Sequence, residues 1–168
     1  MKKVLLMSDT HSYLDDAMIK YIKAADEVWH AGDIGSYDIV ERIKKIKPFK
    51  AVYGNIDGQD IRKEYKLQRR FTIEGIRILM THIGGYPGRY TKRIKPILDK
   101  NPPDLFITGH SHILRVMQDK KYKFLHLNPG AAGIEGFHYM RTMLRFELNN
   151  KEIKNMEVIE LGKRGLII

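Results

Sequence analysis

The 168-residue chain is 43% hydrophobic and 30% charged, a balance that excludes a disordered chain and predicts one folded domain over residues 1–168. It has no cysteine, which excludes disulfides, iron–sulfur clusters and cysteine nucleophiles, and no apolar run near the roughly 20 residues that span a membrane. We therefore expect a cytoplasmic protein that does not cross a membrane. The formal net charge of +10 allows attraction to nucleic acids or phosphorylated substrates, but the basic residues are spread along the chain and favour a solvated surface.

The first half of the chain alternates short apolar segments with amphipathic ones. Continuous apolar runs predict strands at 3–9, 27–33 and 49–55. Helices are predicted between them, at 13–25 and 37–46, because apolar residues recur there at helical spacing. This rhythm is typical of an α/β protein.

The second half is richer in strands. The segment 68–82 predicts two strands joined by a turn at Glu74-Gly75, and a third helix is predicted at 90–99. The remaining apolar runs predict strands at 104–110, 113–119, 121–127, 142–148 and 151–161. The whole order predicts an α/β fold in which two sheets pack together with helices outside.

Five of the predicted strands end in residue types that can bind metals. In chain order these ends are Asp9-Thr10-His11, Gly32-Asp33, Gly54-Asn55-Ile56-Asp57, Thr81-His82 and Gly109-His110-Ser111-His112. Ligands of open α/β sheets bind beyond the carboxyl ends of the strands, where the loops converge. Residues two apart in an extended segment point the same way, so Asp9 and His11 can face one pocket, as can His110 and His112.

Each of these motifs alone has an ordinary structural interpretation. An Asp-Thr-His sequence is commonly a turn with a helix N-cap, and Gly-Asp or Gly-Asn is common turn chemistry. A single histidine after a strand, such as His82, is commonly a packed or surface residue. The occurrence of five such ends in one chain favours a metal site.

The order DTH, GD, GNID, TH and GHSH, together with LNPGAAG at 127–133, closely resembles the calcineurin-like metallophosphoesterases, above all their small single-domain phosphodiesterase branch. The resemblance implies a four-layer α/β/β/α sandwich with two mixed sheets packed face to face. It also implies a dinuclear metal-dependent phosphodiesterase that hydrolyses small phosphodiesters by attack of a metal-bridging hydroxide. A non-catalytic scaffold on the same fold and a nuclease are the alternatives, and the intact ligand set argues against the scaffold.

The resemblance also assigns the site residues. One divalent ion would be held by Asp9, His11, Asp33 and His112, and the other by Asp33, Asn55, His82 and His110, with Asp33 bridging the two. Asp33, Asn55 and His110 are predicted to be catalytic. Oxygen and imidazole ligands without thiolate suit Mn²⁺, the first choice because the family commonly works with it, or Ni²⁺, Zn²⁺ or Fe. Two such ions, two carboxylates and a hydroxide leave about one positive charge, which attracts a phosphodiester.

Several other residues are predicted around these ligands. Asp57 and His30 are predicted to support the ligands from behind, with a simple turn residue and a packed strand histidine as the respective alternatives. In the glycine-rich loop after His82, Arg89 is predicted to contact substrate phosphate, as is Asn55. His126 and His138 are predicted to be structural, although His138 sits near the Asn-Pro-Gly loop.

Ile56 departs from a pattern of the larger family members. Many of these have a histidine at this position, directly after the metal-binding asparagine, which is thought to help protonate the leaving group. Isoleucine cannot donate a proton, so we expect a preference for good leaving groups, as in aryl phosphodiesters. The physiological substrate, the metal and the presence of a homo-oligomer are left open by the sequence.

Overall fold

The structure is a computed structural model that describes residues 1–165. Within these residues the helices are α1 (Asp16–Ala24), α2 (Tyr37–Lys44), α3 (Gln59–Glu64) and α4 (Lys95–Lys100). In this described part of the chain, no helix has the length and apolar character needed to cross a membrane.

The strands form two mixed sheets and a small hairpin. The first sheet has the order β12 (Glu152–Lys163), β11 (Met140–Asn149), β1 (Lys2–Met7), β2 (Glu27–His30) and β3 (Phe49–Ala51). The second has the order β4 (Gln68–Ile73), β5 (Ile76–Thr81), β8 (Leu105–Ile107), β10 (Leu125–Asn128) and β9 (Arg115–Gln118). The hairpin pairs β6 (Gly85–Tyr86) with β7 (Arg89–Tyr90).

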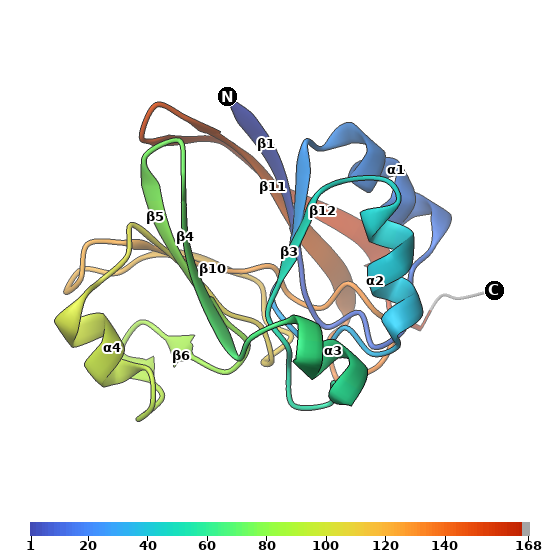
Figure 1. Cartoon of the computed structure of the whole chain (residues 1–168), viewed down its shortest axis with the longest axis horizontal. Coiled ribbons are helices and arrows are strands. Elements are labelled where there is room, and N and C mark those ends of the chain that lie inside the picture. The colour runs from blue at the N-terminus through green and yellow to red at the C-terminus, as the bar shows by residue number, and fades with distance from the viewer. Residues whose placement is uncertain (166–168) are drawn as a thin grey trace.

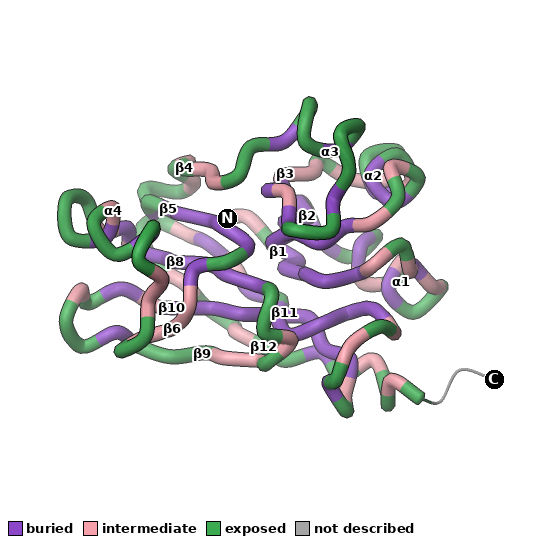
Figure 2. The backbone as a smooth tube through the Cα atoms, turned by 90° about the horizontal axis from the view of Figure 1, so that it is seen from below, coloured by how far each residue is buried: buried purple, intermediate pink, exposed green. Residues whose placement is uncertain are grey.

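The two sheets pack face to face, and helices cover both outer faces (Figures 1 and 2). The core between the sheets takes alternate residues from each strand, for example Val4 and Leu6 of β1 opposite Ile78 and Met80 of β5. The residues between them in sequence face outward: Leu5 and Met7 lie in the cluster covered by α1 and α2, and Leu79 in the cluster with residues of α4. This is the expected period of two for strands buried on both faces. The predicted four-layer α/β/β/α sandwich is confirmed.

The parallel strands bring the predicted ligands to one edge. β1, β2 and β3 are parallel neighbours in the first sheet, and β5 and β8 are parallel neighbours in the second. Their carboxyl ends therefore point the same way within each sheet. A hydrogen bond of 2.7 Å between His82 Nδ1, just after β5, and the carbonyl of Ala31, just after β2, joins the two sheets at this edge.

Three differences from the predicted elements have a clear local cause. α4 begins at Lys95 rather than at residue 90, because Pro96 favours the first turn of a helix and residues 89–90 pair in β7. α3 was not predicted, since its sequence QDIRKE has only one buried residue and no apolar periodicity. The strand predicted at 121–127 begins only at Leu125, because the Asp119 carboxylate accepts hydrogen bonds from the amides of residues 121 and 122 and forms a turn.

Candidate metal centre

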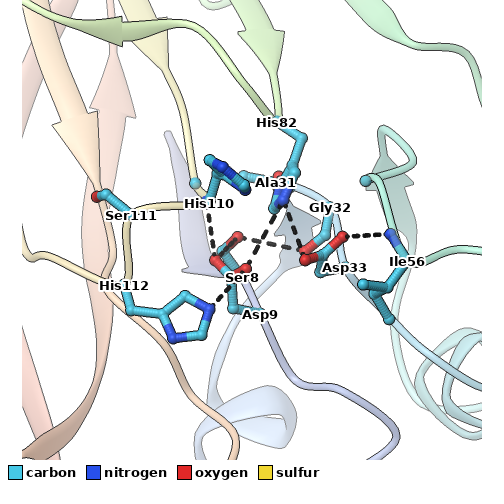
Figure 3. A network of polar contacts seen from close by, with 12 residues as sticks. Ser8, Asp9, Ala31, Gly32, Asp33, Ile56, His82, His110, Ser111 and His112 are labelled. Atoms are coloured by element: carbon cyan, nitrogen blue, oxygen red, sulfur yellow. Dashed lines mark hydrogen bonds and ion pairs between the residues drawn. The ribbon is translucent and has the colours of Figure 1, made fainter. Parts of the chain in front are cut away.

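Six of the seven predicted ligands form two clusters at the shared edge of the sheets. Asp9, His11 and His112 make one cluster, and Asp33, His82 and His110 make the other. Within each cluster, one ligand atom from every residue lies within 4.8 Å of the others. Figure 3 shows ligands from loops of both sheets turned toward a common space, namely Asp9, Asp33, His82, His110 and His112. The Asp9 group is the first cluster, and the Asp33 group is the second cluster.

The Asp33 carboxylate lies between the two clusters. Its Oδ2 atom is 3.2 Å from His82 Nε2 in the second cluster and 3.4 Å from His11 Nε2 in the first. Asp9 Oδ1 is 3.2 Å from His112 Nε2. Asp33 Oδ2 therefore lies beside an imidazole nitrogen of each cluster.

The backbone turns sharply at most of the ligands. Five of them have positive φ angles, which are 53° at Asp9, 45° at His11, 56° at Asp33, 70° at His110 and 60° at His112. This left-handed conformation ordinarily costs a residue other than glycine about 1 kcal/mol, and such residues cluster at functional sites. The side chains therefore converge because the backbone turns at these residues. The prediction that an extended i and i+2 spacing would bring them together was wrong.

Two glycines leave space for the carboxylates. A Cβ atom at Gly54 would lie 2.0 Å from Asp33 Oδ1, and one at Gly109 would lie 3.1 Å from Asp9 Oδ2 and 2.2 Å from the Ser8 hydroxyl. Any side chain at Gly54 would therefore displace Asp33. The glycines before these ligands serve as spacers.

In each carboxylate, hydrogen bonds hold one oxygen, and the other oxygen faces the histidines. Asp9 Oδ2 accepts hydrogen bonds from the Ser8 hydroxyl at 2.7 Å and from the His110 amide at 3.1 Å. Asp33 Oδ1 accepts from the Ile56 amide at 3.1 Å. The oxygens left over, Asp9 Oδ1 and Asp33 Oδ2, are those that face the histidines. Both carboxylates are thereby fixed in orientation.

Hydrogen bonds also fix the imidazole tautomers. His82 Nδ1 donates to the Ala31 carbonyl, which leaves a lone pair on Nε2. His138 Nε2 lies 2.8 Å from the Gly133 carbonyl and donates to it, so His138 Nδ1 is the acceptor for His112 Nδ1–H at 3.2 Å. His112 Nε2 is then also a lone pair, and it points at Asp9. The prediction that His138 is structural missed this orienting contact, for which its place near the Asn-Pro-Gly loop was the only signal in the sequence.

Several polar atoms of the centre have no hydrogen-bond partner, and their chemistry shows whether a cation would fit between them. Asp9 Oδ1, His11 Nε2 and His82 Nε2 are buried without a hydrogen-bond partner, and all three face the centre. An unpaired buried polar group costs about 1–3 kcal/mol. Asp9 Oδ1 and His82 Nε2 are both acceptors, and a cation placed between them would satisfy both. Carboxylate and imidazole donors in this arrangement fit divalent ions.

The charges of the centre shift one another's pKa values. Burial alone would raise the pKa of Asp9, but the imidazoles of His11 and His112 hold that pKa well below its ordinary value. Asp33 behaves likewise, since His11 and His82 outweigh burial and lower its pKa. Asp33 first, and then Asp9, raise the pKa of His11 to about 10. The centre therefore favours positive charge, and a divalent ion must displace the His11 proton to bind.

The two predicted supporting residues contact the ligand loops through the backbone. Asp57 is buried, and its oxygens accept from the amides of Gly35 and Gly54 at 2.8 Å each, which ties together the loops after β2 and β3. His30 is fully buried, and hydrogen bonds with the Thr10 hydroxyl at 2.9 Å and the Gly32 amide at 3.1 Å satisfy both of its nitrogens. Burial lowers the pKa of His30 to about 3. Within residues 1–165, neither residue hydrogen-bonds to a ligand side chain; both hold the loops that carry the ligands.

The two predicted substrate contacts, Asn55 and Arg89, are both exposed. Asn55, the seventh predicted ligand, is exposed and shares the wall of a cavity with His82. Arg89 is exposed on β7 and does not line the two cavities beside the second cluster; the arginines that line them are Arg62, Arg93 and Arg115. The role of Arg89 stays a prediction.

His126 lies on β10, where its Nε2 hydrogen bonds to the Thr108 hydroxyl at 3.0 Å.

Residues 1–151 match a model of the calcineurin-like phosphoesterase superfamily domain. The chain belongs to this superfamily. Its members are metal-dependent phosphoesterases, in agreement with the two candidate metal clusters. The resemblance drawn from the motif order is thereby confirmed at the level of the family.

Similar proteins include two that are named as phosphoesterases and one that is named Vps29. A probable metallophosphoesterase of Methanothermobacter thermautotrophicus is 29% identical over 136 residues, which are 77% of this chain and 76% of that protein. A structure described as a novel archaeal phosphodiesterase has a TM-score of 0.66 at 22% identity and covers 95% of this chain and 99% of its own. Vps29 of Entamoeba histolytica, complexed with zinc, has a TM-score of 0.72 at 17% identity and covers 94% and 98%. The last two likenesses show the fold alone.

Proposed function

We propose that this protein is a phosphodiesterase with two metal ions that hydrolyses small phosphodiesters. The observation that carries the proposal is the position of Asp33 Oδ2, within 3.4 Å of an imidazole nitrogen from each cluster. When bound, two divalent ions would polarise a phosphoryl oxygen and supply a nucleophilic hydroxide at neutral pH. Mn²⁺ is the first choice, and Ni²⁺, Zn²⁺ and Fe suit the same donors.

The residues of the chain have distinct tasks in this reaction. Asp9, His11 and His112 would hold one ion, and His82, His110 and Asn55 the other, with Asp33 shared. Burial lowers the pKa of His110, so its ring is neutral near pH 7, as a metal ligand must be. Because His110 and Asn55 are exposed, the substrate phosphate would approach from their side.

The leaving group would depart with little help from the chain. Ile56 follows Asn55 directly and is 46% exposed, so an apolar group stands where a proton donor would be useful. Bis-p-nitrophenyl phosphate, whose leaving group needs no proton, should therefore be cleaved much faster than a dialkyl phosphodiester. Equal rates for the two would refute a dependence on good leaving groups.

The proposal is tested by metal counting and hydrolysis in the same preparations. We expect bound metal and hydrolysis of bis-p-nitrophenyl phosphate in preference to p-nitrophenyl phosphate, and a loss of about a thousandfold in Asp33→Asn. Asp38→Asn is the matched control, because this carboxylate is exposed on α2. Comparable hydrolysis by Asp33→Asn and the parent would overturn the proposal, and a preference for the monoester would overturn its phosphodiester part.

A scaffold on the same fold is the competing function. It predicts a folded protein that hydrolyses neither nitrophenyl ester after Mn²⁺, Ni²⁺, Zn²⁺ or Fe²⁺ has been added. The full set of predicted ligands in the sequence argues for catalysis, because a scaffold has no need of two carboxylates that each direct an oxygen at the histidines.

A further inference from the structure

A cavity of about 390 Å³ opens beside the second cluster. Asn55 and His82 form part of its wall, and the side chains of Arg62, Arg93, Leu67 and Ile83 form much of the rest. Its volume falls in the range of small-molecule sites, about 300–1,000 Å³. A phosphodiester at the metal centre would therefore have one of its two ester substituents in or near this cavity.

The positive charges of Arg62 and Arg93 are not neutralised by ion pairs. Within residues 1–165, neither guanidinium has a carboxylate within 4.0 Å. Arg62 instead donates to the backbone carbonyls of Asp57 at 2.6 Å and Asn55 at 3.2 Å. Neutral acceptors thus hold the guanidinium in place without cancelling its charge, and further N–H groups stay available because a guanidinium has five.

Arg93 is held in the same way from the other side. It donates to Gln68 Oε1 at 2.6 Å, to the Thr81 hydroxyl at 2.7 Å and to the Ile83 carbonyl at 3.3 Å. Arg62 lies on α3 and Arg93 just before α4, so the two charges reach the cavity from separate elements. Two fixed and uncompensated guanidinium groups are the usual means of binding a phosphate.

Apolar groups form another part of the wall. Leu67 is 42% exposed and Ile83 is 39% exposed. These side chains offer contact to an uncharged organic group such as a sugar or a base. The cavity therefore combines an apolar surface with two cations, next to the position of the reacting phosphate.

A second, smaller cavity lies on the other side of Ile83 and Thr91, which line both. Its volume is about 190 Å³, and His110 and Arg115 are part of its wall. The guanidinium of Arg115 lies over the Tyr86 ring, 4.1 Å from the ring centre. The two cavities thus flank the second cluster unequally, which suits a diester with one large and one small substituent.

We propose that the larger cavity binds the ester substituent of a phosphodiester that carries a second phosphate group, held by Arg62 and Arg93. This inference rests on the proposed function, whose reaction it makes more specific. The substrate class is a small phosphodiester with a second phosphate separated from the first by an organic spacer, as in a nucleoside bisphosphate ester.

The kinetic test compares two substrates that differ only in the second phosphate. These are thymidine 5′-(p-nitrophenyl phosphate) and the same compound with a 3′-phosphate. We expect the 3′-phosphate to lower KM about tenfold in the parent and to lose this advantage in the Arg62→Gln/Arg93→Gln variant. The ratio of the two KM values is the readout, because it cancels a general loss of activity. No advantage of the 3′-phosphate in the parent would overturn the proposal whatever the variant does.

Neighbouring lysines provide matched controls. Lys63 on α3 and Lys92 in the loop before α4 are exposed, and neither lines the cavity. The Lys63→Gln/Lys92→Gln variant removes the same charge and should keep the KM ratio of the parent. A ratio reduced equally in both double variants would show general electrostatic attraction instead of a site.

Calorimetry separates this inference from the proposed function. Thymidine 3′,5′-bisphosphate should bind the parent about tenfold more tightly than thymidine 5′-monophosphate, and the difference should vanish in the arginine variant. That result without any hydrolysis would refute the proposed function and leave the binding site standing. Equal affinities of the two nucleotides would overturn the site. Oligothymidylate should bind no more tightly than the bisphosphate, and tighter binding would overturn the assignment to a small substrate.

Discussion

The two clusters of the metal centre differ in how far their side chains are enclosed. In the first, Ser8 and the His110 amide hold Asp9, and His138 orients His112. In the second, the Ile56 amide holds Asp33, and Ala31 orients His82. Within residues 1–165, one imidazole of each cluster has no hydrogen bond to its ring nitrogens, His11 in the first and His110 in the second. His11 is half-buried, whereas His110 and Asn55 are exposed, so the first cluster is enclosed and the second is partly open.

The cavities lie on the open side. Both are lined by residues of the second cluster, His82 in one and His110 in the other, and neither is lined by Asp9, His11 or His112. A ligand that is rigidly held binds a cation with less loss of side-chain entropy, whereas an exposed ligand leaves room for substrate. On the proposed function, the first cluster would mainly retain its ion and the second would mainly receive substrate.

The largest expected effect is the loss of both clusters together in Gly54→Ala. The new Cβ would lie 2.0 Å from Asp33 Oδ1 and 2.4 Å from Asp33 N, so the shared carboxylate must move. We expect neither ion to bind stoichiometrically and hydrolysis to fall about a hundredfold or more. Gly58→Ala, in the same loop, would place its Cβ 3.4 Å from Asp60 Oδ1 and should behave as the parent. Retention of both ions by Gly54→Ala would contradict the position assigned to Asp33.

The next prediction concerns the unequal clusters directly. Titration of metal-free protein with Mn²⁺ should show two affinities, and His112→Ala should weaken the tighter one, whereas His110→Ala should weaken the looser one. Each loss should be about a hundredfold in affinity, because one ligand is removed. Isothermal titration calorimetry measures both constants in one experiment. Two equal affinities in the parent would remove the distinction between the clusters.

A smaller effect is expected when the support of the first cluster is removed. His138→Ala should weaken the tighter ion about tenfold and leave the looser ion unchanged, because His112 loses the acceptor that fixes its tautomer. His126→Gln, which changes a histidine on β10 away from the centre, is the control. A loss confined to the looser ion would show that His138 acts elsewhere.

The smallest expected effect is on the pH dependence of stability, and it comes from the two histidines buried in the sheets, His30 and His126. Burial lowers the pKa of His126 to about 4 and that of His30 to about 3. Both are neutral when folded and take up protons near pH 6.5 when unfolded, so their contribution is complete above that pH and is lost as the pH falls toward 4. The free energy of unfolding should fall by about 1 kcal/mol per histidine between pH 6.5 and 5.5. Urea denaturation measures this slope, which should be shallower in His126→Gln; an unchanged slope would contradict the assignment.

The sequence predicted much of this fold because its signals are local. The alternation of apolar runs with amphipathic segments located the strands β1, β2, β3, β5 and β8, and with them the loops that carry the ligands. α3 escaped prediction because six polar-rich residues with a single buried isoleucine show no periodicity. Arg89 was singled out from its glycine-rich loop, and only the folded chain shows that Arg62 and Arg93 line the cavity instead.

The residue types and their order were enough to predict the family, the layered architecture and the six side chains of the candidate clusters, since these depend on hydrophobic period and on motifs within a few residues. The division into an enclosed and an open cluster came only from the tertiary structure. It depends on contacts such as those of His138 with His112 and of Asp57 with Gly35, which join loops from distant parts of the chain. Such contacts are set by how the two sheets pack, and no local pattern records them.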